Sequence, residues 1–187
     1  DAKVPSTYTK DEVDRLLKAI DRASPKGKRD YAMVLLACRL GLRASDICGL
    51  MFSNLNWDQS IIYLTQKKTK KEINLPLLQE IGNAIIDYLK HGRPISSLQF
   101  VFLQAIAPYK KLEEPTLHSI VSFYLQRAKI ENCASKKHGP HALRHSLAGF
   151  LLEKKTPLPV ISEILGHDNP ESTNSYLRID IKAPVSY

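Results

Sequence analysis

The residues best suited to chemistry lie in the last third of the chain. His141, Arg144 and His145 recur at spacings of three and four, which places them on one side of a helix whose other side is apolar. Leu165-Gly166-His167 has the form of a helix end, and Tyr176 follows nine residues later. These residue types can exchange protons, hold a phosphate with forked hydrogen bonds, and attack as a nucleophile. Each residue alone is more often an ordinary surface or core side chain, so only the cluster indicates a site.

Two further groups of cations lie in the first half of the chain. Arg43 follows a long apolar segment that ends at Gly41, and Asp46 lies three residues later, where it can hold the guanidinium. Four lysines occur within five residues between two expected strands: Lys67, Lys68, Lys70 and Lys71. Side chains at a hairpin tip cannot serve a core, but they can reach a phosphate. A local ion pair at Arg43 and a solvated hairpin tip are the simpler interpretations.

Helices must position most of these residues. Thr9 and Glu12 form the sequence pattern of a capping box, and the apolar residues that follow predict a helix over about 10–22. A loop over 24–27 then precedes a nearly all-apolar helix over 31–40, which ends at Gly41. Hydrophobic spacing and stop signals predict three more helices, over about 45–50, over 79–90 and from Thr116 onward.

A small sheet interrupts the helices in the middle of the chain. Strand-forming residues predict strands over 54–57, 61–65 and 72–75, with the lysine cluster at the tip between the last two. Downstream, three prolines suited to a first helical turn predict that the last third is helical: Pro140, Pro157 and Pro170. The predicted fold class is therefore α+β, mostly helical with a small antiparallel three-stranded sheet.

The composition is that of one basic globular domain. Of the 187 residues, 43% are hydrophobic and 25% are charged, values that argue against disorder. The formal net charge of +8 favours a polyanionic partner, nucleic acid first. Three scattered cysteines do not form a disulfide framework, and no apolar run approaches the roughly 18 residues of a membrane span. We therefore expect a cytoplasmic protein. Because the chain begins at Asp1 rather than at a methionine, we also expect that upstream domains are missing.

In chain order, these clusters resemble those of the tyrosine site-specific recombinases of the phage-integrase family. The resemblance covers residues 9 to about 180 and rests on Gly41-Leu42-Arg43-x-Ser45-Asp46, Lys68-Thr69-Lys70, His141-x-Leu143-Arg144-His145-Ser146, Leu165-Gly166-His167 and Tyr176. It implies that residues 9–187 form the catalytic domain, that residues 1–8 are a linker stub, and that an N-terminal core-binding domain is absent from this chain.

The resemblance also implies a role for each matched residue. Tyr176 would attack the scissile phosphate to form a 3′-phosphotyrosine, while Arg43 and Arg144 hold the non-bridging oxygens. His141 would exchange a proton with the Tyr176 oxygen, and His167 would donate a hydrogen bond to the phosphate. No metal or other cofactor is implied, because the phosphotyrosine keeps the energy that reseals the strand.

The hairpin offers several candidates for the remaining roles. Lys68 matches the family's general acid toward the leaving 5′ oxygen, although Lys67 and Lys70 lie close enough to compete. The expected DNA contacts are Lys67, Lys70 and Lys71. Behind the residues that touch the phosphate, Asp46 and His145 are expected to support them.

The implied partner is double-stranded DNA, and the implied function is site-specific recombination, such as integration or excision of a mobile element. A homotetramer on two recombination sites is expected for the full-length protein, and a monomer for this chain. The expected location is the cytoplasm of a prokaryote, in association with the nucleoid.

Three other functions compete with this interpretation. Cys133, His138, His141 and His145 could bind zinc, although a zinc site leaves Arg43 and the lysine cluster unexplained. A DNA-binding module without catalysis would keep the fold, but the complete residue set argues against it. A type IB topoisomerase uses similar chemistry to relax supercoils, and a plasmid relaxation assay would separate the two activities.

Overall fold

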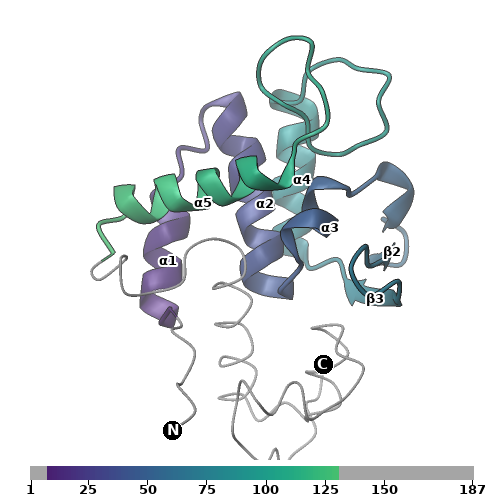
Figure 1. The fold of residues 1–187 in the computed structure, drawn as a ribbon, viewed down its shortest axis with the longest axis horizontal. Coiled ribbons are helices and arrows are strands. Elements are labelled where there is room, and N and C mark those ends of the chain that lie inside the picture. Colours follow the sequence, from purple (N-terminus) through teal and green to yellow (C-terminus); the bar gives the residue numbers. More distant parts are fainter. Residues whose placement is uncertain (1–7, 131–187) are drawn as a thin grey trace, which may run out of the picture.

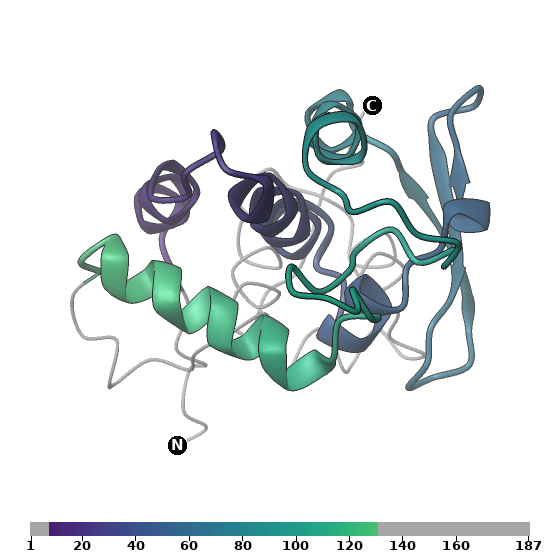
Figure 2. The ribbon, with the colours of Figure 1, turned by 90° about the horizontal axis from the view of Figure 1, so that it is seen from above.

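The computed structural model describes residues 8–130, in which helices surround an apolar centre and a small sheet lies at one side (Figures 1 and 2). Five α-helices occur in this part: α1 (Lys10–Lys18), α2 (Pro25–Leu40), α3 (Ala44–Cys48), α4 (Gln79–His91) and α5 (Glu114–Arg127). A short 3-10 helix, η1 (Phe52–Asn54), leads into the sheet. None of the helices in this part is long and apolar enough to cross a bilayer.

Helix α1 begins as predicted but ends earlier. The Thr9 side chain accepts a hydrogen bond from the Glu12 amide, and the Glu12 carboxylate accepts one from the Thr9 amide, both at 3.1 Å. The helix ends at Lys18 rather than at about residue 22. The Asp21 carboxylate accepts a hydrogen bond from the Ala23 amide at 2.9 Å, which turns the chain there. The buried Ile20 continues the apolar spacing without continuing the helix.

Helix α2 is the buried centre of the molecule. It begins at Pro25 because the Ser24 hydroxyl accepts a hydrogen bond from the Gly27 amide at 2.9 Å and proline fits the first turn. The predicted loop over 24–27 was therefore wrong. The predicted end is confirmed: Gly41 has a φ of 64°, a left-handed conformation that glycine adopts without steric cost.

The sheet confirms the predicted number of strands and their antiparallel order. It consists of β1 (Leu55–Asn56), β2 (Ile61–Thr65) and β3 (Glu72–Pro76), in the order β1-β2-β3. Ile62 lies between Leu55 and Leu75, and all three face the core. The first strand is shorter than the predicted 54–57, because Asn54 belongs to η1 and Trp57 begins a turn.

Helices α4 and α5 enclose the centre. Helix α4 packs against α2, and α5 contacts α1 and α3 on either side of it (Figure 1). Helix α5 begins at Glu114, two residues before the predicted Thr116, because Pro115 fits its first turn. At its other end, the Arg15 guanidinium donates hydrogen bonds to two carbonyls that follow α5, at 2.9 and 2.8 Å.

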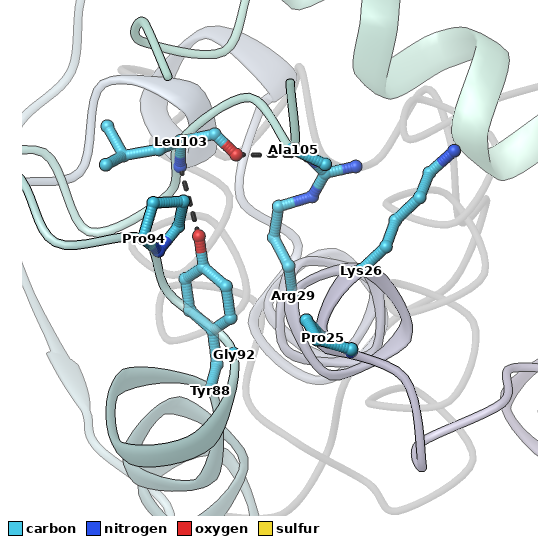
Figure 3. Close-up of a pocket in the computed structure, with 8 residues that line it drawn as sticks. All are labelled: Pro25, Lys26, Arg29, Tyr88, Gly92, Pro94, Leu103 and Ala105. Atoms are coloured by element: carbon cyan, nitrogen blue, oxygen red, sulfur yellow. Dashed lines mark hydrogen bonds between the residues drawn. The ribbon is translucent and has the colours of Figure 1, made fainter. Parts of the chain in front are cut away.

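A buried ion pair fastens α2 to α5 and to the loop after α4. Arg29 donates to the Asp30 carboxylate and to the Leu103 carbonyl, and Tyr124 donates to the other oxygen of Asp30 at 2.7 Å. Figure 3 shows Arg29 beside Tyr88, whose hydroxyl accepts a hydrogen bond from the Leu103 amide at 3.3 Å. The pocket lined by these side chains contains none of the residues predicted to do chemistry.

The two cysteines in the described part, Cys38 and Cys48, are buried in the core with free thiols. Burial raises the pKa of Cys38 to about 12 and that of Cys48 to about 11. Both thiols therefore stay protonated near neutral pH, and neither is a nucleophile.

Candidate functional site

Helix α3 holds Arg43 in a fixed position at its start. Arg43 is the N-cap residue, and its carbonyl accepts hydrogen bonds from the Asp46 and Ile47 amides at 3.0 Å each. Its neighbours Leu42 and Ala44 are buried, so the backbone cannot shift without disturbing the core. The Arg43 side chain lies between these anchors and is half-buried.

The Arg43 guanidinium is only partly satisfied. Its Nη1 atom is buried and has no hydrogen-bond partner within residues 8–130. A buried donor without an acceptor costs about 1–3 kcal/mol, and more when it carries charge. A group held in this way is suited to an anionic ligand with free oxygen acceptors, such as a phosphate.

Asp46 connects α3 to the hairpin between β2 and β3. It is 5% exposed, and its Oδ1 atom accepts a hydrogen bond from the Lys67 amide at 3.0 Å. The ion pair with Arg43 that the sequence suggested does not occur within the described part of the chain, where the carboxylate contacts the hairpin backbone instead. Asp46 thus fixes where the first hairpin lysine leaves the sheet.

Gln66 shapes the hairpin tip from inside. It is fully buried, and its backbone bonds with Lys71 and Lys70 at 2.8 and 2.9 Å close the turn. The Thr69 hydroxyl donates to Gln66 Oε1 at 2.7 Å, while Gln66 Nε2 is buried without a hydrogen-bond partner among the described residues. The tip is therefore a compact turn with defined geometry.

The hairpin lysines point to different environments. The Lys67 ammonium lies over the end of α3, since a Cβ atom on Gly49 would come within 2.8 Å of Lys67 Nζ. Lys67, Lys68 and Lys70 are exposed, and Lys71 is half-buried. Burial lowers the pKa of Lys67, and the positive charge of the nearby Lys111 lowers that pKa further.

The structure brings together one half of the predicted site. Arg43, Asp46 and Lys67 meet around α3, and Lys68, Lys70 and Lys71 belong to the same hairpin. The other predicted residues lie outside the described range: His141, Arg144, His145, His167 and Tyr176. The four residues of the zinc alternative lie there too, and residues 8–130 contain no group of side chains that could hold a metal ion.

Sequence reasoning missed three residues of this region. Lys111 reaches Lys67 from a loop that is distant in sequence, Gln66 lies under the hairpin tip, and Gly49 leaves room for the Lys67 ammonium. Lys111 gave no signal, because it lies in a polar loop without periodic spacing. For Gln66, its place in the alternating burial of β2 could have indicated an inward side chain.

A family model described as the phage integrase family matches residues 6–182 of this chain. A putative integrase/recombinase, y4rA from Sinorhizobium fredii, is 38% identical over 97% of this chain, which spans 44% of that relative. A second one from the same organism, y4gC, is 34% identical over 94% of this chain and 90% of its own length. Tyrosine recombinase XerA of Pyrococcus furiosus is 32% identical over 96% of this chain, which spans 59% of it.

Solved structures share the fold. The crystal structure of XerA recombinase superposes with a TM-score of 0.81 at 25% identity, covering 96% of this chain and 62% of that one. XerH site-specific recombinase bound to its difH substrate superposes with a TM-score of 0.78 at 21% identity, covering 95% of this chain and 52% of that one. The predicted fold class, a mostly helical catalytic domain with a small antiparallel sheet, is thereby confirmed.

Proposed function

Since the chain belongs to the phage integrase family, we propose that it is the catalytic domain of a tyrosine recombinase, which breaks and rejoins double-stranded DNA through a covalent link to Tyr176. The observation that carries the proposal is Arg43, a half-buried residue fixed at the start of α3, whose buried Nη1 atom has no hydrogen-bond partner in the described part. The hairpin lysines beside it supply further positive charge.

The proposed reaction transfers a phosphoryl group without net loss of a phosphoester bond. The Tyr176 oxygen attacks the phosphorus, the bond to the 5′ oxygen breaks, and a 3′-phosphotyrosine forms. His141 accepts the proton of the Tyr176 hydroxyl. Arg43 and Arg144 neutralise the charge on the two non-bridging oxygens, where donors aimed at the transition state have their largest effect.

The remaining roles fall to the hairpin and to a second histidine. A hairpin lysine, Lys68 by resemblance to the family, gives a proton to the leaving 5′ oxygen. His167 donates a hydrogen bond to the phosphate. Rejoining reverses these steps when a 5′ hydroxyl of the partner strand attacks the phosphotyrosine.

The proposed assembly extends beyond this chain. We propose that residues 9–187 form one catalytic domain and that a separate core-binding domain of the longer protein closes around the DNA. Recombination then takes four protomers on two DNA sites, in the prokaryotic cytoplasm. The XerH structure, described as a complex with its difH substrate, supports DNA as the partner.

A covalent-adduct assay tests the proposal. The chain is incubated with a nicked suicide substrate made from the ends of the genetic element that carries its gene, and products are separated on a denaturing gel. We expect a protein–DNA adduct with the wild type and none with Tyr176→Phe, because phenylalanine lacks the attacking oxygen. Binding of the same DNA without an adduct, even after a core-binding domain is supplied, would contradict cleavage and favour a DNA-binding module without catalysis.

A further inference from the structure

We propose that Lys67 and Lys111 form a clamp for a DNA phosphate at the end of α3, so that Lys111 is a DNA-binding residue of this domain. The inference rests on the proposed function and adds a contact that no motif in the sequence indicates. Lys67 comes from the hairpin, and Lys111 comes from the loop before α5, so the clamp joins two separate parts of the fold.

The position of Lys67 is fixed from two sides. Its amide is bonded to the buried Asp46 carboxylate at 3.0 Å, which sets where the side chain starts. Its ammonium lies over Gly49, so closely that a Cβ atom there would come within 2.8 Å of Nζ and 2.9 Å of Cε. Lys67 therefore runs along α3, and it remains exposed to solvent like Lys68 at the same tip.

The position of Lys111 is fixed by its backbone and by an aromatic ring. It forms a β-bridge with Leu103, and its carbonyl accepts a hydrogen bond from the Gln104 side chain at 3.3 Å. Its Nζ atom lies 5.5 Å from the centre of the Phe100 ring, and the side chain is half-buried. The neighbouring Lys110 is exposed.

The two ammonium groups repel each other. Phe100, over which the Lys111 ammonium lies, forms a β-bridge with Met51, two residues from the Gly49 that the Lys67 ammonium covers, so the two ammonium groups come to the same place. The charge of Lys111 accordingly lowers the pKa of Lys67, and Asp46 acts in the opposite direction. An arrangement of like charges is unfavourable unless an anion lies between them, and a phosphate converts the repulsion into two attractions. Because Arg43 begins the same short helix, a DNA strand that contacts one end of α3 passes close to the other.

Duplex binding at several salt concentrations tests the clamp. DNA of any sequence serves, because phosphate contacts are independent of sequence. We expect Lys67→Ala and Lys111→Ala each to weaken duplex binding severalfold. In the double variant, the fall of the logarithm of the association constant with the logarithm of the salt concentration should become less steep by about 1. Lys110→Ala is the matched control. If Lys111→Ala behaves like Lys110→Ala, or if the two single losses add fully in the double variant, the shared phosphate is refuted.

Lysine reactivity gives a readout without cleavage. The native chain is treated briefly with acetic anhydride at pH near 9, and acetylation at each lysine is measured by mass spectrometry. We expect Lys111→Ala to slow the reaction of Lys67, since loss of a neighbouring positive charge keeps more of Lys67 protonated. Duplex DNA should protect Lys67 and Lys111 together.

The two proposals can fail separately. Formation of the Tyr176 adduct without protection of Lys111 overturns the clamp and leaves cleavage standing. If DNA protects both lysines but no Tyr176 adduct forms, the clamp is supported and the proposal of cleavage is contradicted.

Discussion

Two clusters, each with an arginine and a buried aspartate, lie at the two ends of α2, and they differ in how completely the described residues satisfy the arginine. In the first turns of the helix, Arg29 and Asp30 are 3% and 0% exposed, and each contacts more than one partner. Just beyond its last turn, Arg43 has a buried Nη1 atom without a partner among residues 8–130. The same residue types thus serve two purposes in one chain.

The first cluster is closed. Three nitrogens of Arg29 donate hydrogen bonds, two to Asp30 Oδ1 and one to the Leu103 carbonyl, while Tyr124 occupies Asp30 Oδ2. Such a network fixes the positions of α2, α5 and the loop after α4, and each charged group in it has a partner within the described part. Its function is to hold the fold.

The second cluster, which we call open, keeps a buried donor without a partner among residues 8–130. Asp46 Oδ1 is engaged with the hairpin, and Arg43 Nη1 keeps donor capacity that the described residues do not use. Proteins retain such costly groups where function needs them. The comparison predicts that mutations in the closed cluster alter stability and that mutations in the open cluster alter DNA chemistry.

The largest effect on stability is expected from Arg29→Ala. This change leaves the Asp30 carboxylate buried without its ion pair, which costs about 3–5 kcal/mol of the free energy of unfolding. Urea denaturation followed by circular dichroism measures the loss. Arg39→Ala is the control on the same helix, because its pair with Glu80 is partly exposed, with side-chain exposures of 29% and 45%, and should contribute about 0.2–1 kcal/mol. If both variants lose the same free energy of unfolding, the Arg29–Asp30 cluster stabilises the fold no more than an ordinary surface ion pair does.

The next largest effect is a loss of cleavage in Arg43→Ala. Removal of one donor to a charged transition state slows a reaction about 10²–10³-fold, which corresponds to about 2.7–4 kcal/mol. The free energy of unfolding should change by less than about 1 kcal/mol, because residues 8–130 leave Nη1 without a partner. The rate of adduct formation measures the loss of cleavage, and urea denaturation of the same variant measures the change in the free energy of unfolding. A variant that cleaves normally but unfolds readily would reverse the interpretation of the open cluster.

The sequence predicted the elements that depend on local signals. The end of α2 followed from Gly41, whose left-handed conformation few other residues adopt. The strand β2 followed from the strand-forming residues between Ile61 and Thr65, and its alternating burial agrees. The start of α2 was misjudged because Pro25 fits both a loop and a first helical turn, and only the Ser24 cap decides between them.

Only those residues of the candidate site that belong to sequence motifs could be predicted. Arg43 and the lysine hairpin were found from residue type and spacing. The contact of Lys67 with Lys111 could not be found, because it depends on how the loop before α5 folds back over Phe100. Likewise, spacing suggested that Asp46 binds Arg43, although the folded hairpin brings the Lys67 amide to that carboxylate instead.

Tyr124→Phe tests the closed cluster more gently. The change removes the 2.7 Å hydrogen bond to Asp30 and should cost about 1.5–3 kcal/mol, as for other hydrogen bonds to a charged group. Burial and the bond to Asp30 raise the pKa of Tyr124 in the folded protein. Since the hydroxyl of the unfolded chain titrates near pH 10, the unfolded state loses its proton first, and the wild type loses stability as the pH rises above about 10. The difference in unfolding free energy between wild type and variant should therefore narrow above this pH, and a constant difference would show that Asp30 does not hold this proton.

The smallest expected effect comes from Gly49→Ala, which moves the Lys67 ammonium without removing its charge. The φ of Gly49 is −91°, which alanine adopts readily, but its Cβ atom would lie 2.8 Å from Lys67 Nζ and 3.1 Å from the Ser45 carbonyl oxygen. Because a lysine end swings away at little cost, stability should change by less than about 0.5 kcal/mol, whereas duplex binding should weaken severalfold. Gly82→Ala is the control: its Cβ atom would meet the Trp57 ring at an ordinary 3.5 Å, and alanine inside α4 should stabilise the helix by about 0.5–1 kcal/mol without affecting DNA. If Gly49→Ala binds duplex as tightly as Gly82→Ala, the open cluster does not depend on where Lys67 lies.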